Sequence, residues 1–95
     1  MESSTQCSSG TLTMYSKTHF RGKAFTMNGA ITKLANHAFD NIVQSINVKG
    51  CLCWKIYEFE NFKGNSLVLT PGEYSSAVDI KSIFKKASSV ELIDC

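Results

Sequence analysis

Residues 15–22 read YSKTHFRG and residues 57–64 read YEFENFKG. Both match the pattern Y-x-x-x-x-F-x-G, and each fixed position recurs at the same interval (57 − 15, 62 − 20 and 64 − 22 each give 42). Glycine accepts a positive φ or a close backbone approach, and two aromatic rings can cover it. The pattern therefore predicts a tightly folded β-hairpin that occurs twice, with Tyr15, Phe20 and Gly22 in the first copy and Tyr57, Phe62 and Gly64 in the second.

Short segments with alternating apolar and polar residues surround both hairpins, whereas long runs with a helical period are missing. Strands are expected in LTMYS (12–16), KAFTM (23–27), QSINV (44–48), CWKIYE (53–58), SLVLT (66–70) and SSVELI (88–93). Strands that recur about every ten residues are typical of an all-β sandwich or barrel. Short helical turns are expected within ITKLANHAF (31–39) and DIKSIFKK (79–86).

The two hairpins, each followed by a serine that opens a final strand (Ser45 and Ser89), resemble the Greek-key motifs of a βγ-crystallin domain. The resemblance extends from about Leu12 to Ile93. It implies an all-β sandwich of two four-stranded antiparallel sheets, with Greek key 1 at about 11–49 and Greek key 2 at about 51–94. Residues 11–95 would form this single domain, after a flexible tail at residues 1–10.

One further stretch, LTPGEYSS (69–76), resembles the family's turn with a tyrosine corner. The resemblance implies that the Tyr74 hydroxyl bonds back to the main chain, whereas the first half has NGAITKL (28–34) at this place. Alternation along the strands predicts the residues that face the core. They are Leu12, Met14, Phe25, Met27, Ile46, Val48, Trp54, Ile56, Leu67, Leu69, Val90 and Leu92.

The loop DNIVQS (40–45) offers a carboxylate, two amides and a hydroxyl just before a strand. In the family that the chain resembles, a loop of the form [N/D]-[N/D]-x-x-[S/T]-S precedes the last strand of each motif. Two such loops cross and share calcium ions, a cation that takes 6–8 oxygen ligands. The second loop here is FKKASS (84–89).

This resemblance implies one site with every ligand type present: the carbonyls of Glu58 and Lys86, the Ser88 hydroxyl and the Asn41 side chain. Because these ligands are neutral and lysines lie nearby, we expect a dissociation constant on the order of 10⁻⁴–10⁻³ M. The sequence therefore predicts at most one weak Ca²⁺ site.

The other implied site is degenerate. It keeps the carbonyls of Ser16 and Ile42, but Gln44 replaces a serine or threonine and Lys85 replaces a carboxylate or amide. A unit charge 4 Å from a divalent ion costs about 8 kcal/mol at an effective dielectric constant near 20. Lys85 therefore disables this site unless its side chain turns away.

Two alternatives to calcium binding are open. Asp40 and Asn41 could cap the turn before the strand by side-chain-to-backbone hydrogen bonds. The Lys85 ammonium could also lie among the carbonyls of the degenerate site as a built-in cation, which would make the domain independent of calcium.

Functionally, we expect a non-enzymatic structural or stress-related domain, because neither His19 nor His37 belongs to a recognisable catalytic pattern. The alternative is an interaction module of the same fold, similar to a toxin or an inhibitor, that binds no calcium. A net charge of +2 with scattered lysines argues against nucleic acid as a partner. No stretch approaches the roughly 20 apolar residues that a membrane helix needs.

The cysteines lie at positions 7, 51, 53 and 95, and their spacing matches no zinc motif. The first residues show no basic and apolar signal pattern, so a cytoplasmic location is expected, where cysteines are thiols. We expect a monomer, with self-association or an intermolecular disulfide through Cys7 or Cys95 as the alternative.

Overall fold

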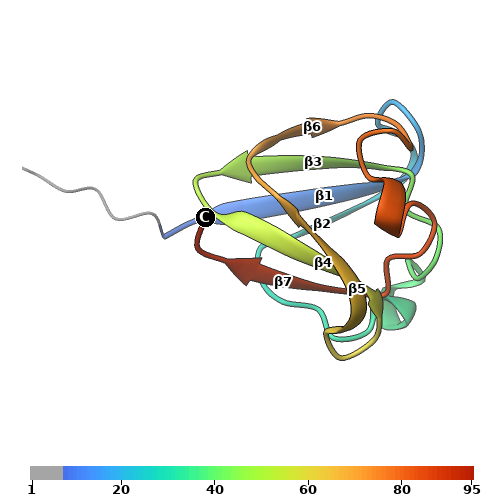
Figure 1. Ribbon diagram of the computed structural model, residues 1–95. Coiled ribbons are helices and arrows are strands. Elements are labelled where there is room, and N and C mark those ends of the chain that lie inside the picture. Colours follow the sequence, from blue (N-terminus) through green and yellow to red (C-terminus); the bar gives the residue numbers. More distant parts are fainter. Residues whose placement is uncertain (1–7) are drawn as a thin grey trace, which may run out of the picture.

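The structure is a computed structural model that describes residues 8–95. Within this range the chain forms strands and two short 3₁₀ helices, and no helix has the length and apolar character needed to cross a membrane (Figure 1). The elements are β1 (Gly10–Lys17), β2 (Arg21–Met27), η1 (Leu34–His37), β3 (Ser45–Gly50), β4 (Cys53–Phe59), β5 (Lys63–Leu69), β6 (Gly72–Tyr74), η2 (Lys81–Ile83) and β7 (Ser89–Ile93). Most of the expected tail, residues 1–7, lies outside the described residues, and β1 begins at Gly10.

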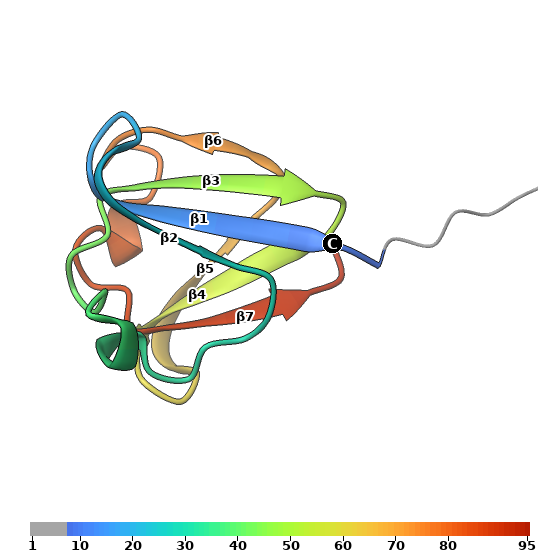
Figure 2. The ribbon, with the colours of Figure 1, turned by 180° about the vertical axis from the view of Figure 1, so that it is seen from behind.

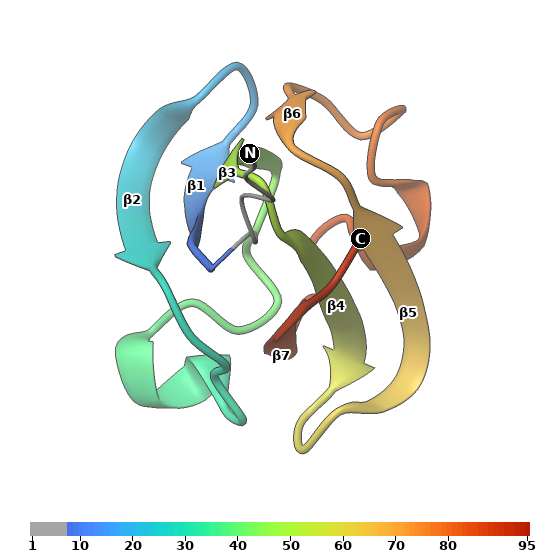
Figure 3. The ribbon, with the colours of Figure 1, turned by 90° about the vertical axis from the view of Figure 1, so that its left-hand side faces the viewer.

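Two antiparallel sheets face each other, as Figure 3 shows. Sheet A has the strand order β2-β1-β3-β6, and sheet B has the order β5-β4-β7. Each sheet contains the hairpin and the final strand of one half of the chain. Because β6 comes from the second half and pairs with β3 of the first, the two halves are interlocked.

Sheet B differs from the expected four strands. Its fourth strand is reduced to one bridge, in which Ile31 and Val90 exchange two backbone hydrogen bonds of 2.9 Å. The matching strand of sheet A, β6, is held by the tyrosine corner, since the Tyr74 hydroxyl donates to the Thr70 carbonyl at 2.6 Å. Ile31 occupies the corresponding place in the first half and has no hydroxyl to make such a bond.

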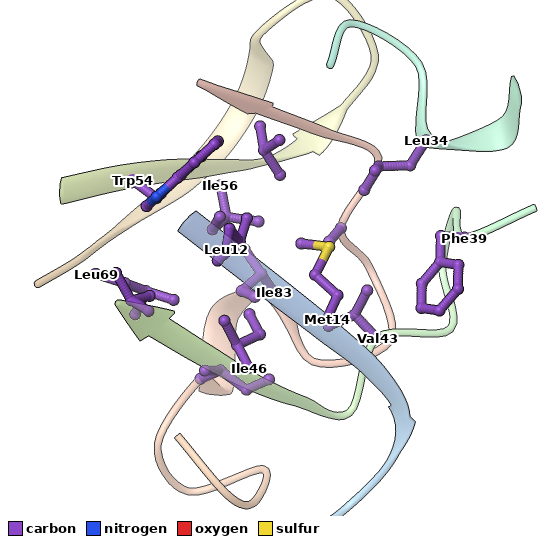
Figure 4. Close-up of a cluster of buried hydrophobic side chains, with 14 of the residues drawn as sticks. Leu12, Met14, Leu34, Phe39, Val43, Ile46, Trp54, Ile56, Leu69 and Ile83 are labelled. Carbon is purple, nitrogen blue, oxygen red and sulfur yellow. The ribbon is translucent and has the colours of Figure 1, made fainter. Parts of the chain in front are cut away.

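The core between the sheets follows the predicted alternation (Figure 4). Nine of the twelve expected residues are buried, and Phe25, Leu67 and Leu92 are partly buried against them. Burial of each large apolar side chain is worth roughly 1.5–3 kcal/mol. The irregular segments add further buried residues that alternation did not predict: Leu34, Phe39, Val43, Ile80, Ile83 and Ala87.

The expectation of free thiols is wrong for the described cysteines, none of which is free. Cys53 and Cys95 form a disulfide with a Cα–Cα distance of 4.9 Å. The pairing of Cys53 with Ile93 brings the C-terminus beside the start of β4, so the bond closes within the chain. Cys95 is therefore not available for the intermolecular bond considered above, and Cys7 lies outside the described residues.

Candidate metal site

The two hairpins position the loops that could bind a metal. In each hairpin the tyrosine and phenylalanine rings lie 5.6 Å apart, Tyr15 against Phe20 and Tyr57 against Phe62. Gly22 and Gly64 adopt φ angles of 80° and 82°, which residues with a Cβ rarely do. The predicted repeat is thus a repeat of geometry as well as of sequence.

Ser45 and Ser89 connect each hairpin to the final strand of its half. The Ser45 hydroxyl donates to the Lys17 carbonyl at 2.6 Å and accepts from the Phe20 N–H at 3.0 Å. Ser89 makes the same pair of bonds, at 2.6 Å to the Phe59 carbonyl and 3.0 Å from the Phe62 N–H. These serines fix the distance between each hairpin and the loop that precedes its serine.

The two loops cross and are joined by a symmetric pair of hydrogen bonds. The Asn41 N–H donates to the Ala87 carbonyl at 2.9 Å, and the Lys85 N–H donates to the Val43 carbonyl at 2.8 Å. Asn41 and Lys85 both adopt left-handed backbone conformations, with φ angles of 59° and 57°. The crossing seen at the end of the sandwich opposite the C-terminus (Figure 1) therefore places the second position of each loop beside the other loop.

Three oxygens of the more complete site meet at this crossing. The Ser88 Oγ lies 3.4 Å from the Asn41 Oδ1 and 3.4 Å from the Lys86 carbonyl oxygen. Hydroxyl hydrogen bonds are normally near 2.7–2.8 Å, so both contacts are weak as hydrogen bonds. Two oxygens that each lie about 2.4 Å from a calcium ion, at right angles, would be about 3.4 Å apart.

Glu58, the fourth predicted contributor, lies where the pairing of β4 with β5 shifts register between Tyr57 and Phe59. Ser16 lies at the matching shift between β1 and β2. A residue at such an irregularity is left out of the regular ladder. The Glu58 carboxylate accepts a hydrogen bond from the Asn65 amide at 3.3 Å.

At the degenerate site, the Lys85 ammonium lies near an aromatic ring. Lys85 is exposed, and its Nζ lies 5.9 Å from the centre of the Phe84 ring. Within residues 8–95 this ammonium has no carbonyl partner, so the built-in cation stays a hypothesis without a supporting contact. Gln44 is half-buried, and its N–H donates to the Tyr15 carbonyl at 2.9 Å.

The loop crossing has two exposed lysines and one carboxylate nearby. Lys85 and Lys86 are exposed, and the Asp40 carboxylate accepts a contact of 3.5 Å from the Asn41 amide. No group of three or more His, Cys, Asp or Glu side chains gathers as a metal cluster in the described part of the chain. Any cation here would be held by neutral oxygens.

Sequence reasoning named the candidate ligands but missed the groups that hold the loops together, the carbonyls of Val43 and Ala87. Val43 and Ala87 are 44 residues apart, as are Ser45 and Ser89. The repeat could therefore have indicated that these two carbonyls occupy equivalent positions. It also missed the link between Cys53 and Cys95, for which the sequence offered no motif.

Comparison with known proteins agrees with this fold. The family model described as Beta/Gamma crystallin matches residues 11–93, so the chain belongs to the βγ-crystallin family. Its members are non-enzymatic structural domains.

Among curated proteins, the chain is 34% identical over 65 residues to a beta/gamma-crystallin of Ciona intestinalis, covering 68% of this chain and 76% of that protein. It is 30% identical over 87 residues to gamma-crystallin B of Canis lupus familiaris, covering 90% of this chain but only 49% of that protein. The chain therefore spans about half the length of the dog protein. The solved structure of a Ciona intestinalis beta gamma crystallin superposes with a TM-score of 0.81 at 30% identity, covering 85% of this chain and 96% of that one.

Proposed function

We propose that this βγ-crystallin domain is a structural or stress-related module with one weak calcium site, formed by Asn41, Ser88 and the carbonyls of Lys86 and Glu58. The observation that supports the proposal is the approach of the Ser88 Oγ to two other oxygens at 3.4 Å, a spacing suited to ligands of one cation. The Glu58 carbonyl, at a break in the β4–β5 ladder, supplies a further oxygen.

The affinity should be low. Neutral oxygens attract a divalent cation less than carboxylates do, and Lys85 and Lys86 add positive charge beside the site. Affinity for calcium follows ligand charge and rigidity, which gives an expected dissociation constant on the order of 10⁻⁴–10⁻³ M. The degenerate site, with Gln44 and Lys85, is proposed to stay empty.

A calcium titration followed by amide chemical shifts tests the proposal. We expect shifts at Asn41, Glu58 and Ser88 that saturate by about 10 mM, given the expected affinity. Ser88→Ala should abolish the saturating shifts, since it removes one ligand. Shifts that stay absent in the unmodified chain up to that concentration would leave a purely structural domain.

The interaction module is kept as a second candidate because the Cys53–Cys95 disulfide favours it. Disulfides persist mainly in exported proteins and oxidising compartments. The cytoplasmic location stays a prediction, and this bond weighs against it. Fractionation of the cells that make the protein, with thiol alkylation before lysis, separates the two: an oxidised Cys53–Cys95 pair in the secretory fraction favours the interaction module.

We also propose that the domain is a monomer. Within residues 8–95 no cysteine is free to form a disulfide with a second chain. Sedimentation in the presence and absence of a reductant tests this, and a dimer that a reductant dissolves would contradict it.

A further inference from the structure

The dipeptide Asn28–Gly29 lies in a bend just after β2, which ends at Met27. Asn28 is exposed, and it borders a hollow of about 300 Å³ that is also lined by Thr11, Thr26 and Met27. Water therefore reaches the Asn28 side-chain amide.

The backbone of this bend is held less tightly than the matching bend of the second half. There the chain reads Pro71–Gly72, and β6 follows at once, anchored by the Tyr74 hydroxyl. In the first half, pairing with β7 is limited to the bridge at Ile31. Figure 2 shows the segment between β2 and η1 passing β7 as a loop, without a strand of its own.

Gly29, the residue after Asn28, has open surroundings. A Cβ at this position would have no atom within 4 Å. Its N–H donates no hydrogen bond within the described part of the chain. The nitrogen is therefore free to turn toward the side chain of the preceding residue.

We propose that Asn28 is a site of spontaneous, water-consuming deamidation. The Gly29 backbone nitrogen loses its proton and attacks the Asn28 Cγ, so that a new N–Cγ bond forms. The Cγ–Nδ2 bond breaks, and the side-chain nitrogen leaves as ammonia with the transferred proton. Water then opens the five-membered succinimide at either carbonyl, which yields aspartate or isoaspartate and requires no other reactant.

Several other asparagines are protected by their backbone surroundings. The nitrogen after Asn61 belongs to Phe62 and donates to the Ser89 hydroxyl at 3.0 Å. Asn47 and Asn65 lie within strands β3 and β5, whose backbones are held extended by pairing. Each of these asparagines also precedes a residue with a side chain, which hinders ring closure.

The modification changes the molecule in two ways. The net charge falls from +2 to +1, because a neutral amide becomes a carboxylate. Isoaspartate also adds one main-chain carbon to the link between β2 and Ile31. In the described residues, the bridge at Ile31 is the only strand-like contact between this link and β7.

Peptide mapping of the intact chain after incubation at mildly alkaline pH provides the test. Trypsin cuts after Lys23 and Lys33, and the fragment 24–33 contains Asn28 as its only asparagine. We expect this fragment to gain one mass unit and to split into two products of equal mass. A synthetic peptide of residues 24–33 serves as the unfolded reference, and the folded protein should react within several-fold of its rate.

Two variants complete the design. Gly29→Ala should slow the conversion several-fold without unfolding the chain, since the position has room for a Cβ. The Asn28→Ser variant should keep its isoelectric point during the incubation, whereas that of the unmodified chain should fall. The proposal is overturned if the fragment keeps its mass in the folded protein while the synthetic peptide reacts, or if another asparagine fragment reacts first.

Discussion

Ser45 and Ser89 show how one hydroxyl per half supports an unusual backbone. Phe20 and Phe62 have φ angles of 58° and 61°, a region that costs roughly 1–2 kcal/mol for a residue with a Cβ. Each is held there by its N–H bond to the serine Oγ, while the same hydroxyl donates to a carbonyl. Loss of one hydroxyl therefore removes two hydrogen bonds to the main chain at once.

Ser89→Ala is expected to lower the free energy of unfolding by about 1–3 kcal/mol, the cost of buried polar groups left unsatisfied. Ser88→Ala is the matched control, because Ser88 lies beside it and the two contacts of its hydroxyl are each as long as 3.4 Å. It should change stability little but abolish the calcium response. Urea unfolding of both variants measures the difference, and an equal loss in the two would contradict separate roles for them.

Asn41 and Lys85 occupy equivalent left-handed positions but differ in how well they suit them. Asparagine is enriched in this conformation, whereas lysine is not. Lys85→Asn is expected to raise stability by about 0.5–1 kcal/mol and to restore a ligand at the degenerate site. Calorimetry with calcium and urea unfolding provide the readouts.

The control for this change is Lys86→Asn, which removes the same charge from a neighbour that is not left-handed. It should strengthen calcium binding slightly through charge alone and leave stability unchanged. If Lys85→Asn and Lys86→Asn behave alike, the effect is only electrostatic and the backbone argument is wrong.

The sequence predicted which residues meet at the site, but it did not predict the direction of every side chain. Asn41 and Ser88 were expected to meet although 47 residues separate them, because their loops are fixed by a motif, and their side chains do meet. The direction of Lys85 could not be predicted, since it depends on the nearby Phe84 ring and not on the motif.

At the scale of elements, β7 connects the loop crossing to the start of β4. Ser88 and Ser89 stand at its beginning, and the Cys53–Cys95 disulfide lies just past its end. The bond closes a loop of sequence separation 42, and cross-linking a loop of this length restricts the unfolded chain.

The double variant Cys53→Ser with Cys95→Ser should lose about 4 kcal/mol of stability, on the chain-entropy model for that loop length. The unmodified chain treated with a reductant should lose at least as much, because Cys51 is disulfide-bonded too and its bond is reduced at the same time. Denaturant unfolding under both conditions measures it. A loss below roughly 1 kcal/mol would mean that this bond is absent or unimportant in the folded protein, given the usual range of such effects.

Tyr57 joins β4 to β7, because its hydroxyl donates to the Glu91 Oε1 at 2.9 Å. Burial, and next the bond to Glu91, raises the pKa of Tyr57 above its ordinary value of 10.0. The folded chain therefore holds this proton more tightly than the unfolded chain does. Stability from this group is complete below about pH 10 and is lost as the pH rises through the folded pKa.

Unfolding free energies measured from about pH 8 to about pH 12, a range that brackets the ordinary tyrosine pKa, should show this decline. Tyr57→Phe keeps the ring against Phe62 and removes the titrating hydroxyl, so its profile should be flatter over the same range. A profile unchanged by the substitution would assign the decline to other groups.

Six of the seven strands were predictable because each has a period of two, whereas β6 was expected only as part of a turn with a tyrosine corner. The 3₁₀ turns were recognised within 31–39 and 79–86. The reduction of the fourth strand of sheet B to one bridge at Ile31 was not predicted, although this half lacks the tyrosine that anchors β6 in the other. The core residues from irregular segments, such as Val43 and Ile83, also escaped prediction, since such segments have no period.

At the scale of the molecule, the two halves share a core and also exchange a strand and loop contacts. Strand β6 of the second half completes sheet A, and each crossing loop donates an N–H to the other. A cation at the crossing would be shared by ligands from both halves, Asn41 from the first and Ser88 from the second. Its binding would therefore stabilise the whole domain and not one loop.

Because both halves would share the ion, calcium should raise the melting temperature of the whole domain. A ligand that binds only the folded state adds RT ln(1 + [L]/Kd), which is about 1.4 kcal/mol at 10 mM calcium for a constant near 1 mM. For a domain of this size, that raises the melting temperature by roughly 6–11 °C. Magnesium at the same ionic strength should give a smaller rise, because it demands a tighter octahedral shell and dehydrates reluctantly. The whole melting transition should move without broadening, since both halves share the ion. A calcium-dependent rise that survives Ser88→Ala would instead place the cation away from the crossing.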